Sequence, residues 1–224
     1  QGVKVFPAIG ANSDSVAELA MGAIYVMFRR SFLATPDVIA GKWPRLELMG
    51  REVQGKTLGI IGMGWTGQAL AWRARGNGMH RIGFDPWVKK DDPRWADCKV
   101  ERAETLDDLL PRCDAISIHV PLTDDTRGLF NAQTIAKMKD RAVLMNLSRG
   151  GIVDEQAMVD ALKSGKLWGA FTDVFVEEPL KTPNIFDGVP NLYCTPHVGP
   201  RTEEGEGKVS TVTADAVLNC LNGN

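Results

Sequence analysis

Apolar positions follow two patterns along the chain, and the first belongs to the N-terminal part. Residues 16–28 (VAELAMGAIYVMF) are apolar on nearly every side of a helix, and Asn12, Ser13 and Asp14 precede them as possible caps. We expect such a helix to be buried, either in a core or against a partner. Residues 35–56 then mix proline, glycine and charged residues, which predicts a connection with a short helical piece.

From Thr57 onward, short apolar runs alternate with helix-like segments. The pattern predicts strands over residues 58–61, 81–84, 115–120, 142–146 and 170–175. It predicts helices over residues 68–75, 106–110, 131–138 and 156–164. Apolar strands that alternate with helices of about ten residues are typical of a parallel sheet with helices on both faces. The predicted fold class is therefore α/β, a doubly wound parallel sheet.

Composition narrows the classes of function. The 224 residues suffice for one domain or one and a half, and 26 basic against 28 acidic residues give a net charge of -2. No sequence-wide positive field exists to hold a nucleic acid. The longest apolar stretch, residues 16–28, contains Glu18 and is shorter than the roughly 20 residues that span a bilayer, so we expect no membrane partner.

The cysteines bear on the cellular compartment. They are far apart and form no C-x-x-C pair, which argues against a disulfide framework or a structural zinc site: Cys98, Cys113, Cys194 and Cys220. No charged and apolar secretory signal opens the chain. We therefore expect a cytoplasmic protein without a bound metal.

A glycine-rich segment follows the first strand of the alternating region. Gly62-Met63-Gly64-Trp65-Thr66-Gly67 lies directly after a predicted strand and directly before a predicted helix. Gly62 permits a tight turn, Gly64 lets the backbone approach a pyrophosphate, and Gly67 allows the helix to pack closely. The N-terminus of the helix supplies a positive dipole to the phosphates. The segment predicts a Rossmann-type dinucleotide site.

An acidic residue supports this interpretation and bears on the choice of cofactor. Asp85 ends the next predicted strand, about 20 residues on, where a carboxylate would accept hydrogen bonds from the ribose hydroxyls. Such a carboxylate repels the 2′-phosphate of NADP, so NAD is the expected cofactor. The nearby Lys89 and Lys90 leave the strictness of that preference open.

A second group of polar residues lies further along the chain. Arg149 and Glu178 each follow a predicted strand, at the edge where open α/β sheets place their ligands, and His197 follows Thr195-Pro196. An arginine fork matches a carboxylate, and a histidine exchanges protons near neutral pH. A carboxylate beside the histidine would favour its protonated form. Taken singly, such residues are usually surface or loop residues; together with the glycine motif they indicate catalysis.

These residues and the segments around them resemble a known family. The chain is similar to the D-isomer-specific 2-hydroxyacid dehydrogenases, which include phosphoglycerate, glycerate, formate and D-lactate dehydrogenases. The similarity covers nearly the whole chain in the segments 15–18 (SVAE), 55–62 (GKTLGIIG), 119–123 (HVPLT), 146–155 (NLSRGGIVDE), 173–175 (DVF), 178–179 (EP) and 195–199 (TPHVG).

The resemblance implies roles for individual residues. Arg149 would hold the substrate carboxylate and carbonyl, His197 would transfer the proton, and Glu178 would orient the histidine and raise its pKa. Asp173 would accept a hydrogen bond from the nicotinamide carboxamide. The implied cofactor-binding set is Gly62, Gly64, Trp65, Thr66, Gly67, Asp85, His119, Val120, Pro121, Leu147, Ser148, Arg149, Asp173, His197 and Gly199.

The resemblance also implies a domain organisation. Residues 5–198 would form the NAD-binding domain, and residues 199–224 a C-terminal helix that returns toward a substrate domain largely missing from this sequence. The helix near residues 16–28 would form a homodimer interface. Thr66, in place of an aliphatic residue, and Pro200, in place of a small one, depart from the family pattern.

Three functions fit these features. The first is hydride transfer between NAD(H) and a small 2-hydroxy or 2-keto acid, whose identity depends mostly on the missing domain. The second is an NAD(H)-sensing corepressor of the same fold; such proteins carry a tryptophan soon after the histidine, whereas Pro200-Arg201-Thr202 stands here, which favours a metabolic enzyme. The third is a bare NAD-binding module.

Overall fold

A seven-stranded parallel sheet forms the centre of the molecule. The computed structural model describes residues 3–30 and 34–222. The strands are β1 (Thr57–Ile61), β2 (His80–Phe84), β3 (Glu101–Arg102), β4 (Ala115–Ile118), β5 (Ala142–Asn146), β6 (Leu167–Thr172) and β7 (Leu192–Cys194). Their order across the sheet is β3-β2-β1-β4-β5-β6-β7. The doubly wound α/β fold class predicted from the sequence is confirmed.

The strand order reverses at β1. This strand pairs in parallel with β2 on one side and with β4 on the other. In open α/β sheets a crevice forms outside the carboxyl ends of the strands at such a reversal, and ligands bind there. The glycine motif begins directly after β1 and therefore lies at the reversal point.

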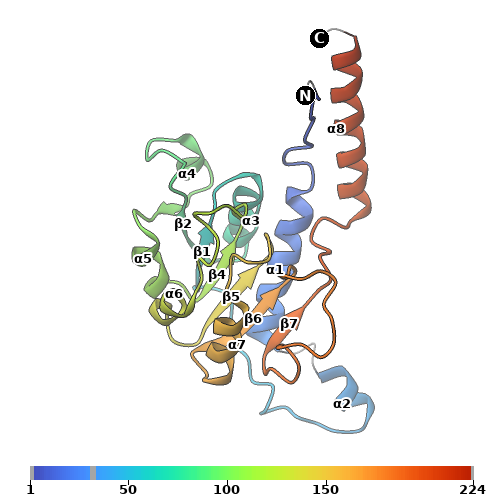
Figure 1. Cartoon of the computed structure of the whole chain (residues 1–224). Helices are drawn as coiled ribbons and strands as arrows, with labels where there is room; N and C mark the ends of the chain where they lie inside the picture. The colour runs from blue at the N-terminus through green and yellow to red at the C-terminus, as the bar shows by residue number, and fades with distance from the viewer. Residues whose placement is uncertain (1–2, 31–33, 223–224) are drawn as a thin grey trace.

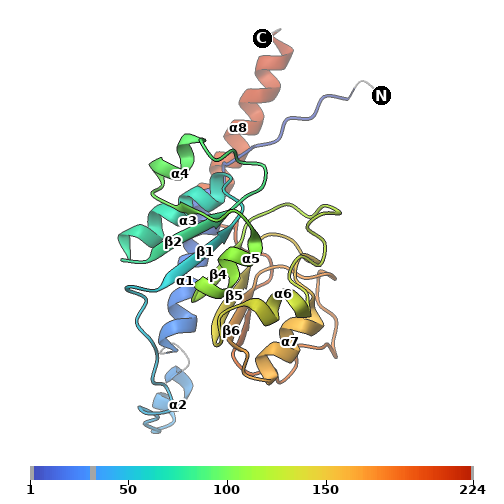
Figure 2. The same cartoon turned by 90° about the vertical axis from the view of Figure 1, so that its left-hand side faces the viewer.

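Helices cover both faces of the sheet (Figures 1 and 2). One face carries α1 (Ser13–Arg29) and α3 (Trp65–Gly76). The other carries α5 (Leu106–Leu109) with the 3₁₀ turn η2 (Leu110–Arg112), α6 (Ala132–Lys137) and α7 (Glu155–Lys163). The short helix α4 (Pro93–Asp97) adds Trp95 to the first of these faces, whereas α2 (Thr35–Ile39) and α8 (Glu203–Leu221) lie outside the two layers. No helix of the described residues is both long and apolar enough to span a bilayer.

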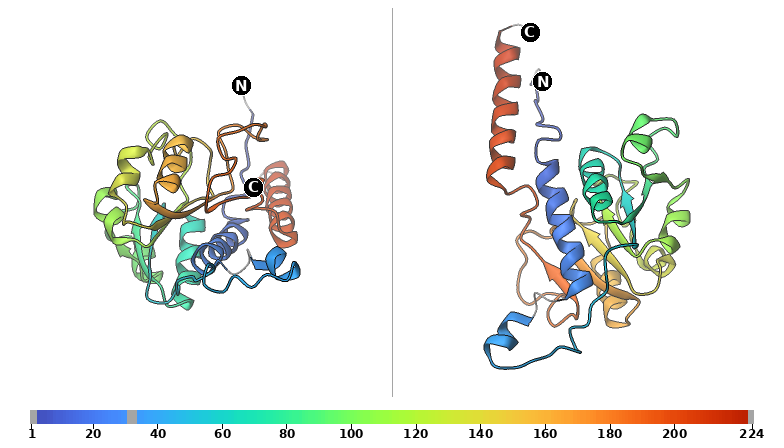
Figure 3. Two further views of the ribbon diagram at one scale, coloured as in Figure 1. Left: turned by 90° about the horizontal axis from the view of Figure 1, so that it is seen from below. Right: turned by 180° about the vertical axis from the view of Figure 1, so that it is seen from behind.

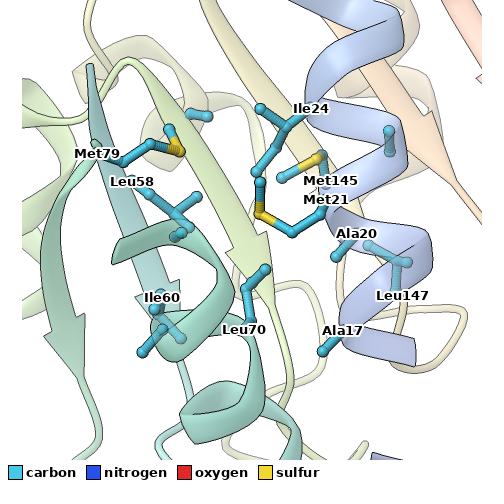
Figure 4. Packing of buried hydrophobic residues seen from close by; sticks show 14 of the residues in the cluster. Ala17, Ala20, Met21, Ile24, Leu58, Ile60, Leu70, Met79, Met145 and Leu147 are labelled. Atoms are coloured by element: carbon cyan, nitrogen blue, oxygen red, sulfur yellow. The ribbon is translucent and has the colours of Figure 1, made fainter. Parts of the chain in front are cut away.

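Alternate strand residues build two cores. In β5, Val143 and Met145 pack under α1 and α3, whereas Leu144 packs under the helices of the opposite face. Figure 4 shows the first core, where Met145 and Leu147 meet Ala20 and Met21 of α1. Because successive side chains of a strand point to opposite faces, such a strand must be apolar throughout. This explains the uninterrupted apolar runs in the sequence.

The helix α1 is half covered by its own domain. Its small and apolar residues pack on α3, β5 and β6, which confirms that the helix is buried in a core on this side. At its polar edge, Arg73 of α3 pairs with Asp14 at 3.0 Å and with Glu18 at 2.8 Å. The rest of the helix faces outward.

The helix α8 projects beyond the sheet and runs beside the N-terminal segment (Figure 3). Lys4 Nζ lies 3.1 Å from Cys220 Sγ, and Ser15 Oγ shares a 2.8 Å hydrogen bond with Thr202 Oγ1 at the start of α8. The boundary at residue 198 and the return of residues 199–224 toward a substrate domain stay predictions; residues 223 and 224 lie outside the described part.

The predicted strands and helices agree with the structure to within a few residues, and two of the differences are informative. The strand expected at 115–120 ends at Ile118, and the strand expected at 170–175 is β6, which ends at Thr172. In both cases the chain leaves the sheet where the candidate site begins. The short elements β3, β7 and α4 have too few residues to produce a periodic pattern.

Candidate active site

The sequence-predicted site residues gather along one edge of the sheet. Gly62 follows β1, Asp85 follows β2, His119 follows β4, Arg149 lies three residues after β5, and Asp173 follows β6. Parallel strands all point the same way, so these carboxyl ends share one edge. The structure therefore brings together residues that are more than 100 positions apart in the sequence.

The three glycines of the motif have different surroundings, which explain why a side chain is absent at each position. Gly62 has a φ of +94°, and a Cβ there would lie 2.5 Å from the carbonyl oxygen of His119. A Cβ on Gly67 would lie 2.0 Å from the carbonyl oxygen of Gly62. Gly64, the N-cap of α3, has open space where its Cβ would be. The first amides of α3 lack partners within the helix and face this space, which suits a pyrophosphate.

Hydrogen bonds from the backbone fix the side chain of Asp85 beside the glycine turn. Its Oδ2 accepts a hydrogen bond from Met63 N at 2.8 Å, and its Oδ1 accepts one from Trp87 N at 3.0 Å. Each carboxylate oxygen has a second lone pair for a ligand hydroxyl. The carboxylate is thus oriented beside the glycine turn before a ligand binds.

The segment 119–121 after β4 forms the opposite wall of the reversal point. His119 Nε2 shares a hydrogen bond of 2.8 Å with Ser117 Oγ, and burial lowers the pKa of His119 to about 4. The ring is therefore neutral near pH 7. The carbonyl of Val120 accepts a hydrogen bond from Ser148 Oγ, and that of Pro121 accepts one from Thr126 Oγ1 at 2.6 Å.

The turn that carries Arg149 is braced by an asparagine at the end of β5. Asn146 Nδ2 donates to the carbonyl of Arg149 at 2.9 Å, and Asn146 Oδ1 accepts from Ser148 N at 3.2 Å. The side chain of Arg149 is exposed, whereas that of Leu147 is buried under α1 (Figure 4). Only the backbone of Leu147 is therefore free to meet a cofactor.

Glu178 and His197 are in direct contact. Glu178 Oε2 accepts a hydrogen bond from His197 Nδ1 at 2.8 Å, and Oε1 accepts one from Phe175 N at 2.8 Å. Partial burial acts to raise the pKa of Glu178, but the hydrogen bonds from His197 and Phe175, with the charges of His197 and Arg149, lower it below its ordinary value. The carboxylate therefore stays ionised beside the imidazole.

Asp173 fixes the loop that presents His197. Its side chain is only 1% exposed and accepts hydrogen bonds from Thr195 Oγ1 at 2.6 Å and from the amides of Val198 and Gly199, each at 2.8 Å. These bonds tie the end of β6 to the chain on both sides of His197, whose φ is +55°. Contact of Asp173 with a nicotinamide carboxamide stays a prediction.

A cavity of about 530 Å³ opens beside the Glu178–His197 pair. Its lining includes two residues that the sequence did not suggest, Leu180 and Cys194, because no element was predicted between 176 and 194. The apolar Leu192-Tyr193-Cys194 just before Thr195-Pro196-His197 was the available signal for a strand there. The cavity is lined by Phe175, Glu178, Pro179, Leu180, Cys194, Thr195, Pro196 and His197.

A glycine turn at a strand-order reversal, with a histidine–carboxylate pair on the same edge, defines a nucleotide-dependent oxidoreductase domain. Residues 21–199 match the family model of the D-isomer specific 2-hydroxyacid dehydrogenase, NAD binding domain. The chain therefore belongs to the D-isomer specific 2-hydroxyacid dehydrogenases. The predicted family, the dehydrogenase class and NAD as the cofactor are confirmed.

Individual relatives show how far the similarity extends. The (S)-sulfolactate dehydrogenase of Chromohalobacter salexigens is 45% identical over 219 residues, 98% of this chain and 70% of that protein. The D-3-phosphoglycerate dehydrogenase of Methanocaldococcus jannaschii is 40% identical over 223 residues, 100% of this chain but 42% of that protein. The NAD-dependent formate dehydrogenase of Staphylococcus aureus, solved in complex with NAD, has a TM-score of 0.85 at 29% identity, over 96% of this chain and 64% of that one.

The lowered pKa of Glu178 makes a prediction for stability. A carboxyl whose folded-state pKa is depressed stabilises the fold above its unfolded pKa of about 4.3, and this contribution is lost as the pH falls through the folded pKa. We expect Glu178→Gln to lower the Tm at pH 7 and the difference from wild type to shrink toward pH 3 in calorimetric scans. Glu177→Gln, which removes an exposed carboxylate paired with Lys181, is the control. A Tm difference that stays constant over this range would contradict the pairing.

Proposed function

We propose that the whole protein transfers a hydride between NAD(H) and a small 2-hydroxy or 2-keto acid. The observation that supports this most is the hydrogen bond between Glu178 and His197 on the same sheet edge as the glycine turn. Both curated relatives described above are named as dehydrogenases, so the corepressor alternative has no observation in its favour. An assay of the whole protein with NADH against a panel of 2-keto acids identifies the substrate.

The proposed chemistry divides between cofactor and side chains. The nicotinamide ring, when bound, gives or takes the hydride. His197 uses Nδ1 to donate to Glu178, which leaves Nε2 to accept the hydroxyl proton during oxidation and to return it during reduction. Arg149 binds the substrate carboxylate through its guanidinium fork and polarises the keto oxygen. The ionised Glu178 stabilises the imidazolium that forms.

We infer that the cofactor lies along the edge from Asp85 to Gly199. Gly62, Gly64 and Gly67, with the backbone of Trp65 and Thr66, would hold the pyrophosphate, and Asp85 the ribose. The segment His119, Val120 and Pro121 would line the adenosine side, and the turn Leu147, Ser148, Arg149 would face the middle of the cofactor. Asp173, His197 and Gly199 would surround the nicotinamide.

The role of Asp85 is tested by cofactor affinity. We predict that the chain binds NADH more tightly than NADPH, and that Asp85→Ala weakens NADH binding by about 10- to 150-fold, because charge-assisted hydrogen bonds are worth about 1.5–3 kcal/mol. In fluorescence titrations, the preference of the Asp85→Ala variant for NADH over NADPH should be smaller than that of the wild type. Asp91→Ala, which removes an exposed carboxylate nearby, is the control. Equal affinities for NADH and NADPH in the wild type would refute the assignment.

The catalytic roles are tested in the complete protein. We expect His197→Ala to lower kcat by about 10²- to 10⁴-fold with little change in NADH affinity, because the imidazole acts on a proton in the transition state. Arg149→Lys should raise KM and lower kcat, since lysine keeps the positive charge but cannot make the bidentate contact of the guanidinium. His80→Ala removes an exposed histidine at the start of β2 and should leave kcat unchanged. Turnover by His197→Ala within a few-fold of wild type would exclude the proposed acid–base role.

We also propose that two copies associate through the outward side of α1. A hollow of about 630 Å³ with a mostly apolar lining lies between this helix, Phe171 and Thr195, and it includes Leu19, Gly22 and Tyr25. The segment after α1 adds exposed apolar side chains, among them Ile39 and Trp43. Exposed apolar surfaces of this kind usually mark interfaces, and a second copy is the commonest partner.

The proposed interface is tested by a substitution that leaves the fold of the domain undisturbed. A Cβ on Gly22 would have no neighbour within 4 Å, so Gly22→Glu places a charge in the hollow without a clash inside the domain. We expect a dimer mass for the wild type in light scattering at micromolar concentration and a monomer mass for this variant. Gln133→Glu on α6, at the other face of the sheet, should remain a dimer. A monomeric wild type would rule out the interface.

A further inference from the structure

Three arginines surround one tryptophan at the edge of the sheet opposite the candidate site. Their guanidinium carbons lie 5.5 Å (Arg30), 4.7 Å (Arg51) and 4.3 Å (Arg141) from the ring centroid of Trp168. Arg30 directly follows α1, Arg51 precedes β1, Arg141 directly precedes β5, and Trp168 is the second residue of β6. All four residues lie near the amino ends of the strands, away from the glycine turn and His197.

Backbone and side-chain contacts hold this group in place. Trp168 Nε1 donates to the carbonyl of Met27 at 3.1 Å, and Arg51 Nη2 donates to the carbonyl of Arg141 at 3.1 Å. Arg141 has a φ of +59°, a backbone conformation that favours glycine, and still carries its side chain over the indole. Three arginines therefore share a single tryptophan ring, whereas one cation–π interaction requires only one.

The positive charges are not neutralised within the described residues. Arg30, Arg51 and Arg141 make no ion pair within 4.0 Å in residues 3–30 and 34–222, whereas Arg73 meets two carboxylates. Asp114 acts on Arg51 electrostatically, but it already pairs with Lys139 at 2.7 Å and accepts from Thr57 N at 2.9 Å. The Nε atoms of Arg30 and Arg51 are buried and have no hydrogen-bond partner.

Arg51 and Arg141 repel each other electrostatically. Burial and the charge of Arg141 lower the pKa of Arg51. Like charges that act on each other disfavour the folded arrangement unless a counter-charge is present. Guanidinium forks bind planar or tetrahedral oxyanions through several charge-assisted hydrogen bonds. A ligand with two or more negative charges would supply the counter-charge that this group lacks among the described residues.

We propose that Arg30, Arg51 and Arg141 around Trp168 form a binding site for a small multivalent oxyanion, a phosphate ester or a polycarboxylate. Arg30 and Arg51 also flank the segment that carries α2, and Arg51 N donates to the carbonyl of Phe28 at 2.7 Å. A bound anion would therefore hold the two ends of that segment together. It would do so at a site separate from the sheet edge that carries the glycine turn and His197.

The test compares thermal unfolding of the chain with sodium pyrophosphate and with citrate, at constant ionic strength. Saturating NADH keeps the glycine turn occupied, so that an anion does not act there. At about ten times the Kd of the anion we expect calorimetry to show a rise in Tm of about 3–6 °C. A response to pyrophosphate alone identifies a phosphoryl ligand, and a response to citrate alone identifies a polycarboxylate; either supports the site.

Matched variants separate this site from general salt effects. Arg51→Gln should abolish the rise in Tm, and so should Arg141→Gly, in which glycine suits the positive φ and keeps the backbone intact. Arg51→Lys keeps the charge and should retain part of the response. Arg75→Gln is the control, because Arg75 lies 5.5 Å over Trp72 as a single arginine–tryptophan pair. No rise in the wild type, or an equal rise in Arg51→Gln and Arg141→Gly, overturns the proposal.

Discussion

The contact between the backbones of Gly62 and Gly67 determines where the functional edge can form. A side chain at Gly67 would overlap the carbonyl of Gly62, so α3 comes this close to β1 only because no side chain is present. A second close backbone contact lies in the part of the site that carries Arg149. A Cβ on Gly150 would lie 1.9 Å from the carbonyl oxygen of Phe175, so this contact also requires glycine. These two contacts place the helix N-terminus and the Arg149 turn at the same sheet edge.

The histidine loop depends on carboxylates that act in different ways. Asp173 is buried and holds Thr195, Val198 and Gly199, so it positions the loop. Glu178 is partly exposed and contacts the imidazole itself, so it acts on the proton balance of the ring. Both carboxylates follow β6 within six residues of its end. A single strand terminus thus sets the direction and the electrostatics of the proposed acid–base group.

The sequence predicted the fold class and the glycine turn because both depend on local patterns. Five buried strands have short apolar runs, and the glycine motif has fixed spacing after one of them. The bracing of Arg149 by Asn146 and of the histidine loop by Asp173 was not visible, since hydrogen bonds across loops leave no periodic signal. The cluster around Trp168 was missed for the same reason, because its members at 30, 51, 141 and 168 meet only when the sheet is assembled.

The position of α1 in the chain sets the order in which the domain can fold during synthesis. This helix precedes every strand of the sheet in the chain, yet it packs against β5 and β6, which end at Asn146 and Thr172. At about 5–20 residues per second, the ribosome makes β6 on the order of ten seconds after α1. During that interval the apolar side of the helix has only α3 and, later, β5 to cover it. A nascent chain of this protein is therefore a candidate for capture by chaperones that recognise apolar helices, until the sixth strand emerges.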